Sequence, residues 1–449
     1  MLAFETIGSA TAIVYDGDPL LSTDAWINGC AYFGSWTHDY EIPPAQRDAI
    51  RRCKFHWFSH GHPDHLNIES LPELSAGEFL IADHFGGRIH RDLVALGHRV
   101  RVLKDREWVQ LSPRVRIMNI ACANQDSCLL VDVGGHLIID LNDSPDLGWS
   151  YFIRRVAKNY KHSYVMQLHG WSGADMANIY LPDGSRAKAI PEYKTTIAPR
   201  IQAAALRFGA KAAIPFSSFH RYQRSDSLWA NALVPDLADY GADADPTKPP
   251  VLPAFVRIDC VTGEVTRLRP PRRAVVVKAP EEYGDRWSDC LEADEFAELK
   301  TYFGRLEQLQ QCFGFLTFRV GGREHTLDLN ADKHGIGIAF EVPRNSLMTA
   351  VRNNVFDDLL IGNFMRTTLF GVKGLYPDFS PFVAKYSDNG GAHSLADLKA
   401  YHRHYRRRDL TGYYLHWLEG SADRIVRTLL PEGSPPFRVA KTLYWRMMR

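Results

Sequence analysis

The stretch Ser59-His60-Gly61-His62-Pro63-Asp64-His65 places four potential metal ligands within six residues. Imidazole nitrogen suits zinc, iron, copper and nickel, and an added carboxylate favours the harder ions of that set. His60 and His62 can reach one ion from an extended loop, whereas Asp64 and His65 point toward a second position. We therefore interpret this stretch as a metal-binding loop rather than a solvated loop that is merely rich in histidine.

The residues on either side of this loop predict a strand before it and a helix after it. Residues 54–59 carry large apolar side chains typical of a buried strand, and Asn67 can cap a short helix through 69–71. The HxHxDH motif in this order resembles the metallo-β-lactamase superfamily. The resemblance implies that His60 and His62 hold one metal ion and that Asp64 and His65 hold a second.

Composition excludes several classes of partner. The chain has 449 residues, 45% hydrophobic and 23% charged, with a net charge of +1, so nothing indicates a nucleic acid or an acidic membrane. Seven scattered cysteines without a Cys-x-x-Cys pair favour reduced thiols and offer no Rieske cluster. We find no signal peptide and no apolar run approaching the ~20 residues of a membrane span. These features predict a cytoplasmic protein.

The chain is long enough for two domains. Alternating strands and helices in the first part favour an α/β (α+β) fold, and with the resemblance they predict an αββα sandwich that carries its metals at the mouth between the sheets. Prolines between 240 and 280 mark linking segments. We expect a catalytic domain over 1–275 and a smaller α+β region over 276–449, for substrate covering or self-association. Within that region we expect helices over 293–311 and 347–360 and a hairpin over 315–329.

The superfamily pattern indicates where the remaining ligands lie. A bridging aspartate is expected after a strand near the middle of the domain, and Asp143 fits this place, with Asp140 as the alternative. The last ligand is a histidine that follows a later strand, for which His220 fits best and His169 is the alternative. In related proteins an aspartate at the position of Asp24 supports the ligand loop through hydrogen bonds instead of binding metal.

One position departs from the hydrolase pattern. A histidine usually stands shortly before the bridging aspartate, but the segment 122–127 here has none, and Asp126 is its only strong ligand. An aspartate at this position makes the site richer in oxygen, which suits iron better than zinc. Two divalent ions, iron with zinc as the alternative, are therefore the expected cofactors.

Short segments through residues 5–235 resemble the CMP-N-acetylneuraminate hydroxylase-like branch of the superfamily. The resemblance implies an O2-dependent di-iron monooxygenase that acts on a small organic substrate. Because the sequence carries no Rieske motif, electrons would come from a separate ferredoxin or reductase. The alternative is a hydrolase that attacks a phosphoester, lactone or amide with a metal-bridging hydroxide, in which Asp64 orients the hydroxide or moves its proton. A homodimer is compatible with either function.

Overall fold

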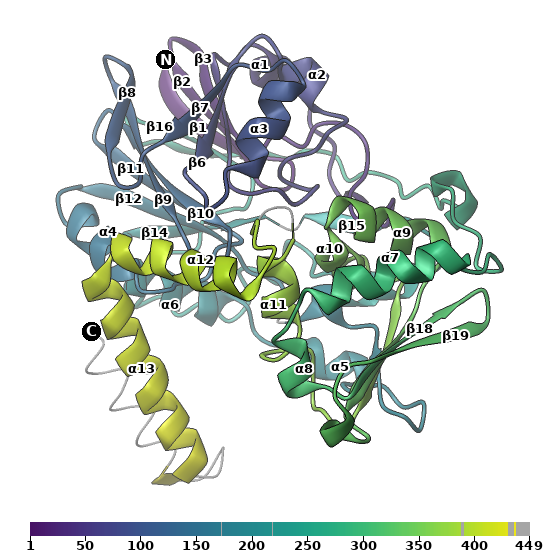
Figure 1. Ribbon diagram of the computed structural model, residues 1–449. Helices are drawn as coiled ribbons and strands as arrows, with labels where there is room; N and C mark the ends of the chain where they lie inside the picture. Colours follow the sequence, from purple (N-terminus) through teal and green to yellow (C-terminus); the bar gives the residue numbers. More distant parts are fainter. Residues whose placement is uncertain (172, 218, 388–389, 430–434, 437–449) are drawn as a thin grey trace.

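Two β-sheets face each other in the first part of the chain (Figure 1). The computed structural model describes residues 1–449 except 172, 218, 388–389, 430–434 and 437–449. The first sheet has the order β17-β16-β1-β2-β3-β5-β6-β7. Its strands are β1 (Leu2–Ile7), β2 (Thr11–Asp16), β3 (Asp18–Thr23), β5 (Phe55–Phe58), β6 (Glu78–Ala82), β7 (Val100–Leu103), β16 (Val256–Asp259) and β17 (Val265–Arg267).

The second sheet has the order β14-β12-β11-β10-β9-β8. It comprises β8 (Trp108–Ser112), β9 (Val115–Ala121), β10 (Ser127–Val133), β11 (His136–Asn142), β12 (His162–Leu168) and β14 (Ala212–Phe216). A strand covered on both faces should be apolar along its whole length, and β10 is an example. Its Leu129 and Val131 belong to the core between the sheets, whereas Cys128 and Leu130 belong to an outer core.

Helices cover the outer faces of both sheets. The helix α1 (Pro44–Arg51) packs on β2 and β3, α3 (Arg88–Ala95) packs on β7, and α6 (Ala198–Phe208) packs on β12 and β14. The helices α2 (Leu71–Leu74) and α4 (Ser150–Ala157) lie against α1 and α6 respectively. Helix, sheet, sheet and helix therefore form four layers, which confirms the αββα sandwich.

A second core lies in the C-terminal region. Its sheet has the order β13-β21-β20-β18-β19, with β13 (Ile179–Tyr180), β18 (Phe315–Val320), β19 (Arg323–Asp328), β20 (Gly337–Glu341) and β21 (Arg366–Phe370). Helices α7 (Ala293–Gly304), α8 (Leu309–Cys312), α9 (Arg344–Asn353), α10 (Phe356–Ile361) and α11 (Ser380–Lys385) accompany it. The predicted hairpin over 315–329 is confirmed as β18 and β19.

Two predicted helices are each divided in the structure. The helix expected over 347–360 is α9 followed by α10, because Asn354 adopts a left-handed conformation, with φ 59°, that ends the first helix. The helix expected over 293–311 is α7 followed by α8. The turn between them brings Leu306, which is fully buried, into the core.

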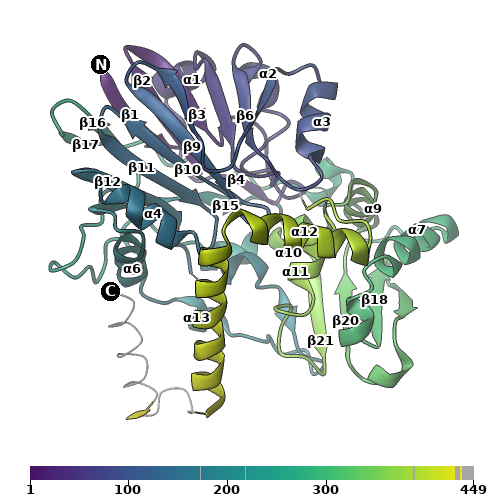
Figure 2. The ribbon, with the colours of Figure 1, turned by 60° about the vertical axis from the view of Figure 1, so that its left-hand side comes forward.

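Segments on each side of the expected domain boundary near residue 275 pack against the other region. From the first part, β13 pairs with β21 of the C-terminal sheet. From the last part, α12 (Leu395–Arg408) returns to the sandwich, where the Tyr401 hydroxyl donates to the Ala123 carbonyl at 2.9 Å. The final helix, α13 (Leu410–Leu429), packs beside α4 and then projects away from the body of the molecule (Figure 2). Among the described residues, no helix has the length and apolarity to cross a membrane.

Candidate metal centre

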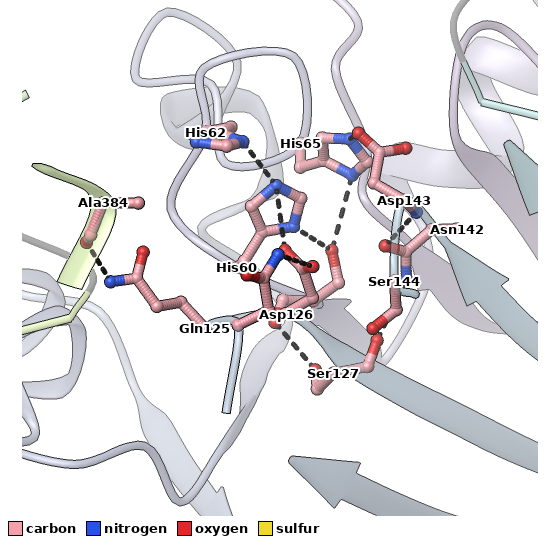
Figure 3. Close-up of polar contacts among 12 residues, drawn as sticks. His60, His62, His65, Gln125, Asp126, Ser127, Asn142, Asp143, Ser144 and Ala384 are labelled. Atoms are coloured by element: carbon pink, nitrogen blue, oxygen red, sulfur yellow. Dashed lines mark hydrogen bonds and ion pairs between the residues drawn. The ribbon is translucent and has the colours of Figure 1, made fainter. Parts of the chain in front are cut away.

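The histidine-rich loop begins where β5 ends, at the mouth between the two sheets. The ring nitrogen Nε2 of His60 lies 2.8 Å from Nδ1 of His62, so the two imidazoles converge as the sequence predicts (Figure 3). The far nitrogen of His60, Nδ1, lies 2.8 Å from the hydroxyl of Ser59. The loop itself is closed by hydrogen bonds from the amides of His65 and Leu66 to the carbonyl of His62.

His65 directs one ring nitrogen, Nε2, toward two carboxylates. Its Nε2 lies 3.2 Å from Oδ2 of Asp143 and 3.4 Å from Oδ2 of Asp64. Its Nδ1 lies 3.0 Å from Asp24, which also accepts a hydrogen bond from the Ser59 amide. Asp24 therefore supports the loop without facing the centre, as expected. His65 and Asp64 lie beside each other, as the proposed second ion requires.

Asp143 stands at the end of β11, where the chain leaves the second sheet. Its Oδ1 accepts a hydrogen bond from Ser217, and its amide donates to the side chain of Asn142 at 2.6 Å. Asn142 has a φ of 40° and anchors the corner by donating to the Ser127 carbonyl. Asp140 instead accepts a hydrogen bond from the Asn142 amide. The structure thus brings Asp143, rather than Asp140, to His65.

Asp126 lies in the turn between β9 and β10 and faces the loop. Its Oδ1 is 3.8 Å from Nε2 of His60, and its side chain is 6% exposed. Burial, with a contribution from the negative charge of Asp143, raises the pKa of Asp126 to about 6. The carboxylate predicted to replace the usual imidazole is therefore directed toward the same imidazole pair (Figure 3).

The two candidate histidines from later strands lie elsewhere. His220 begins β15 (His220–Tyr222), which pairs with β4 (Trp36–His38), and its ring stacks on Trp36 with centroids 3.3 Å apart. Burial lowers the pKa of His169, after β12, to about 3. Neither belongs to the two groups of clustered ligand atoms found among the described residues. The assignment of the last ligand to His220 or His169 stays a prediction.

The donor groups at the mouth fit cations. Burial, and then the positive charges of His65 and His62, lower the pKa of His60 well below its ordinary value, so this imidazole is neutral. Burial opposes protonation of His65, but the charges of Asp64, Asp143 and Asp24 outweigh it and raise the pKa of His65. The positive charge of protonated His65 thus offsets the negative charges of these carboxylates, as the charge of the proposed ion would. Neutral imidazole and carboxylate together are the ligands that iron and zinc accept.

Three residues that the sequence analysis did not select also reach the site. Tyr32 donates a hydrogen bond of 2.5 Å from its hydroxyl to Oδ1 of Asp64. Asp357 and Asp358, on α10 of the C-terminal region, offer carboxylate oxygens close to His62. Tyr32 belongs to no recognisable sequence motif. Asp357 and Asp358 are adjacent acidic residues on a helix, a pattern typical of a solvated face. Only the path of the chain in space identifies them.

A pocket of about 230 Å³ has His220, the proposed last ligand, in its wall. Its lining includes Trp171, Asp175, Arg200, His220 and Tyr222. Burial and the negative charges of Asp143 and Asp64 raise the pKa of Asp175 to about 7, which places this carboxyl within electrostatic reach of the candidate ligands. A pocket of this size with both charged and aromatic walls suits a small polar molecule.

Comparisons with known proteins agree with the resemblance over part of the chain. No family model matches. A segment of 137 aligned residues is 29% identical to the cytidine monophosphate-N-acetylneuraminic acid hydroxylase of Asterias rubens, covering 28% of this chain and 21% of that protein. The Danio rerio hydroxylase is 25% identical over the same length and is covered to 23%. The chain thus spans about a fifth of the length of these relatives.

Solved structures include proteins of both expected activities. Igni18, a metallo hydrolase from Ignicoccus hospitalis, has a TM-score of 0.39 at 11% identity and covers 60% of this chain and all of that chain. CmlA, a diiron β-hydroxylase from Streptomyces venezuelae, has a TM-score of 0.36 at 12% identity, covering 60% and 54%. The four layers and the histidine-rich loop at their mouth resemble the metallo-β-lactamase fold. Over the aligned segment, the sequence similarity is to cytidine monophosphate-N-acetylneuraminic acid hydroxylases.

Proposed function

We propose that this chain is a dinuclear metal enzyme, and specifically an O2-dependent di-iron monooxygenase that acts on a small organic substrate. The observation that carries the proposal is the position of Asp126, whose carboxylate faces His60 where a hydrolase of this fold has a histidine. The candidate ligands are His60, His62, Asp64, His65, Asp126 and Asp143, with His220 as the proposed last member. Iron bound there would supply redox chemistry with O2, whereas zinc has no accessible second oxidation state.

The protein's own residues contribute position, charge and exclusion of water. Asp64 and His65 are almost completely buried, so water reaches them only through the mouth. Tyr32 occupies one oxygen of Asp64, which leaves the other oxygen directed at His65. The pocket that His220 lines would admit the substrate, and Arg200 and Asp175 supply polar groups to orient it. An electron donor and a homodimer stay predictions.

A metal-dependent hydrolase is the second candidate, and one observation favours it. Asp175 lies in the wall of the pocket that also contains His220, where a carboxyl can serve as a general acid or base. In this function Asp175 would give a proton to the leaving group of a phosphoester, lactone or amide held in the pocket. An oxygenase would use the same carboxyl only to bind the substrate.

Metal analysis of protein purified with its native ions tests the proposal. We expect two irons per chain, near-ultraviolet charge-transfer absorption, and O2 consumption that depends on an added reductant. The variant Asp126→His should shift the bound metal from iron toward zinc, because it restores an imidazole. Asn124→His, at an exposed position in the same turn, is the matched control. Two zincs per chain with phosphodiesterase turnover would instead establish the hydrolase.

A further inference from the structure

We propose that Asp357, on helix α10 of the C-terminal region, is a positioning residue that orients His62 at the metal centre. The inference rests on the proposed dinuclear site and adds a part to it from outside the sandwich. On this view the C-terminal region completes the centre, in addition to any part in covering the substrate.

The three imidazoles of the loop share one arrangement. Each has one nitrogen directed into the centre and the other directed at a polar partner outside it. For His60 that outer partner is the Ser59 hydroxyl, and for His65 it is the carboxylate of Asp24. Histidines that bind metal usually donate their second N–H to a carboxylate or carbonyl, which fixes the tautomer and the ring orientation.

The outer partner of His62 comes from the second region. His62 directs Nδ1 toward His60, at 2.8 Å, and directs Nε2 toward Oδ2 of Asp357, at 3.6 Å. Of the three imidazoles, His62 is therefore the one whose outer partner is a residue of the C-terminal region.

Asp357 is placed to serve this purpose and has no competing partner for one of its oxygens. Its side chain is 9% exposed, and Oδ1 accepts no hydrogen bond from any described residue. A buried carboxylate with an unpaired oxygen is costly to fold, so its retention indicates a role at the site it faces. The other oxygen, Oδ2, faces the imidazole of His62, which the loop holds at the centre.

The end of α10 is fastened to the sandwich, which fixes Asp357 relative to the loop. The Ser35 hydroxyl donates to the Gly362 carbonyl at 2.5 Å. The Asn363 side chain accepts from the Ala177 amide at 2.8 Å and donates to the Ala174 carbonyl at 2.9 Å. On the other side of the helix, Phe356 is fully buried in the C-terminal core. Asp357 is thus held between the sandwich and the C-terminal core.

A different use of the same residues would be a separate cation between His62, Asp357 and Asp358, whose ligand atoms lie within 4.8 Å of one another. That site would require one imidazole to bind metal through both nitrogens, since Nδ1 already faces His60. Orientation of His62 by Asp357 requires only one metal contact for each ring, and we therefore favour it.

Metal-binding constants of five proteins test the inference. Metal-free wild type, Asp357→Asn, His62→Ala and the double variant are titrated with Co2+ against a chromophoric chelator, and the visible absorption of bound Co2+ is recorded. We expect Asp357→Asn to weaken one of two ions by about 10–100-fold and to alter its absorption bands. In the His62→Ala background the same substitution should change nothing, because its target is gone. Asp357→Glu, which keeps a carboxylate, should recover part of the affinity.

The outcomes separate this inference from the proposed function. A wild-type chain that binds no Co2+ overturns both. Two tightly bound ions in wild type, with unchanged affinity in Asp357→Asn, overturn the positioning role alone. An equal loss in the presence and absence of His62, or an equal loss in Asp357→Glu and Asp357→Asn, also overturns it. A third ion that disappears in Asp357→Asn would make Asp357 a ligand instead. Urea unfolding of each metal-free variant verifies that it is folded.

Discussion

Tyr32 shows how a single buried hydroxyl can govern a carboxylate at the candidate centre. Burial and the negative charge of Asp64 raise the pKa of Tyr32 well above its ordinary value, so the phenol keeps its proton and acts as a donor. The hydrogen bond fixes Oδ1 of Asp64 and leaves Oδ2 beside His65. The orientation of the Asp64 carboxylate therefore depends on Tyr32, which is not itself a candidate ligand.

Replacement of Tyr32 by phenylalanine removes the donor and keeps the ring. We expect the ion held by Asp64 and His65 to bind about 10–100-fold more weakly, since this is the usual cost of losing a partner that orients a ligand. Calorimetric titration of the metal-free protein measures the effect. Tyr15→Phe is the matched control, because that buried hydroxyl donates to the carboxylate of Glu5, which is not a candidate ligand. Equal loss of affinity in both variants would assign Tyr32 a general structural role.

At the scale of secondary-structure elements, the parts that were predictable from sequence are those specified locally. The apolar strand before the loop is β5, and the turn at Gly134-Gly135 joins β10 to β11 as its glycines indicate. The helix over 198–208 ends at Gly209, which has a φ of 71°. In each case one short run of residues contains both the pattern and the signal that ends it.

Other features depend on contacts between distant segments and could not be predicted in this way. The break between α9 and α10 follows from Asn354, whose side chain accepts from Arg305, about fifty positions away in the chain. The approach of Asp357 to His62 likewise requires α10 to dock on the sandwich. The HxHxDH motif identifies four candidate ligands, but the outer partners of their rings are set by tertiary structure.

Asn354, the left-handed residue between α9 and α10, allows the cause of the break between these helices to be tested. Asn354→Ala should lower the free energy of unfolding by about 1–2 kcal/mol, because asparagine tolerates this left-handed conformation better than alanine does. The bond from Arg305 is lost as well. Urea denaturation measures the change. Asn354→Gly loses the same bond but tolerates the conformation, so it should be less destabilised than Asn354→Ala. Equal destabilisation of the two would show that backbone strain contributes nothing.

At the scale of the whole molecule, buried imidazoles make stability sensitive to acid. Burial lowers the pKa of His56 to about 4 and that of His38 to about 3, from an ordinary value near 6.5. The unfolded chain therefore binds these protons at a higher pH than the folded chain does. Folding stability must fall as the pH decreases from about 6.5 toward the folded-state values.

The variant His56→Gln should reduce this pH dependence. Each such imidazole contributes a slope of up to about 1.4 kcal/mol per pH unit within its window. Free energies of unfolding measured from pH 7 to 4.5 should therefore fall less steeply for the variant than for the wild type. Parallel curves for the two proteins would mean that His56 does not carry part of the acid sensitivity.

The two regions of the molecule are joined by a buried ion pair. Arg224, which follows β15, is fully buried, and its Nη1 lies 2.7 Å from Oδ2 of Asp285. Asp285 in turn accepts hydrogen bonds from the amide and hydroxyl of Ser346, at the start of α9. The guanidinium also lies 4.0 Å from the ring centroid of Phe364. The helices that carry Asp357 and the sandwich that carries His62 thus share one charged contact.

Removal of one partner should be far more damaging than removal of both. Arg224→Met leaves Asp285 buried without its cation, and we expect a loss of about 3–5 kcal/mol in the free energy of unfolding. Arg224→Met with Asp285→Asn should lose less than the sum of the single changes, because position 285 then carries no unpaired charge. Asp226, which also accepts from Arg224, loses that partner in both Arg224 variants. Arg114→Met breaks an exposed pair with Asp16 and should cost less than about 1 kcal/mol. Urea unfolding of wild type, Arg224→Met, Asp285→Asn, the double variant and Arg114→Met gives these values. An Arg224→Met variant no less stable than Arg114→Met would show that this ion pair does not hold the C-terminal region on the sandwich.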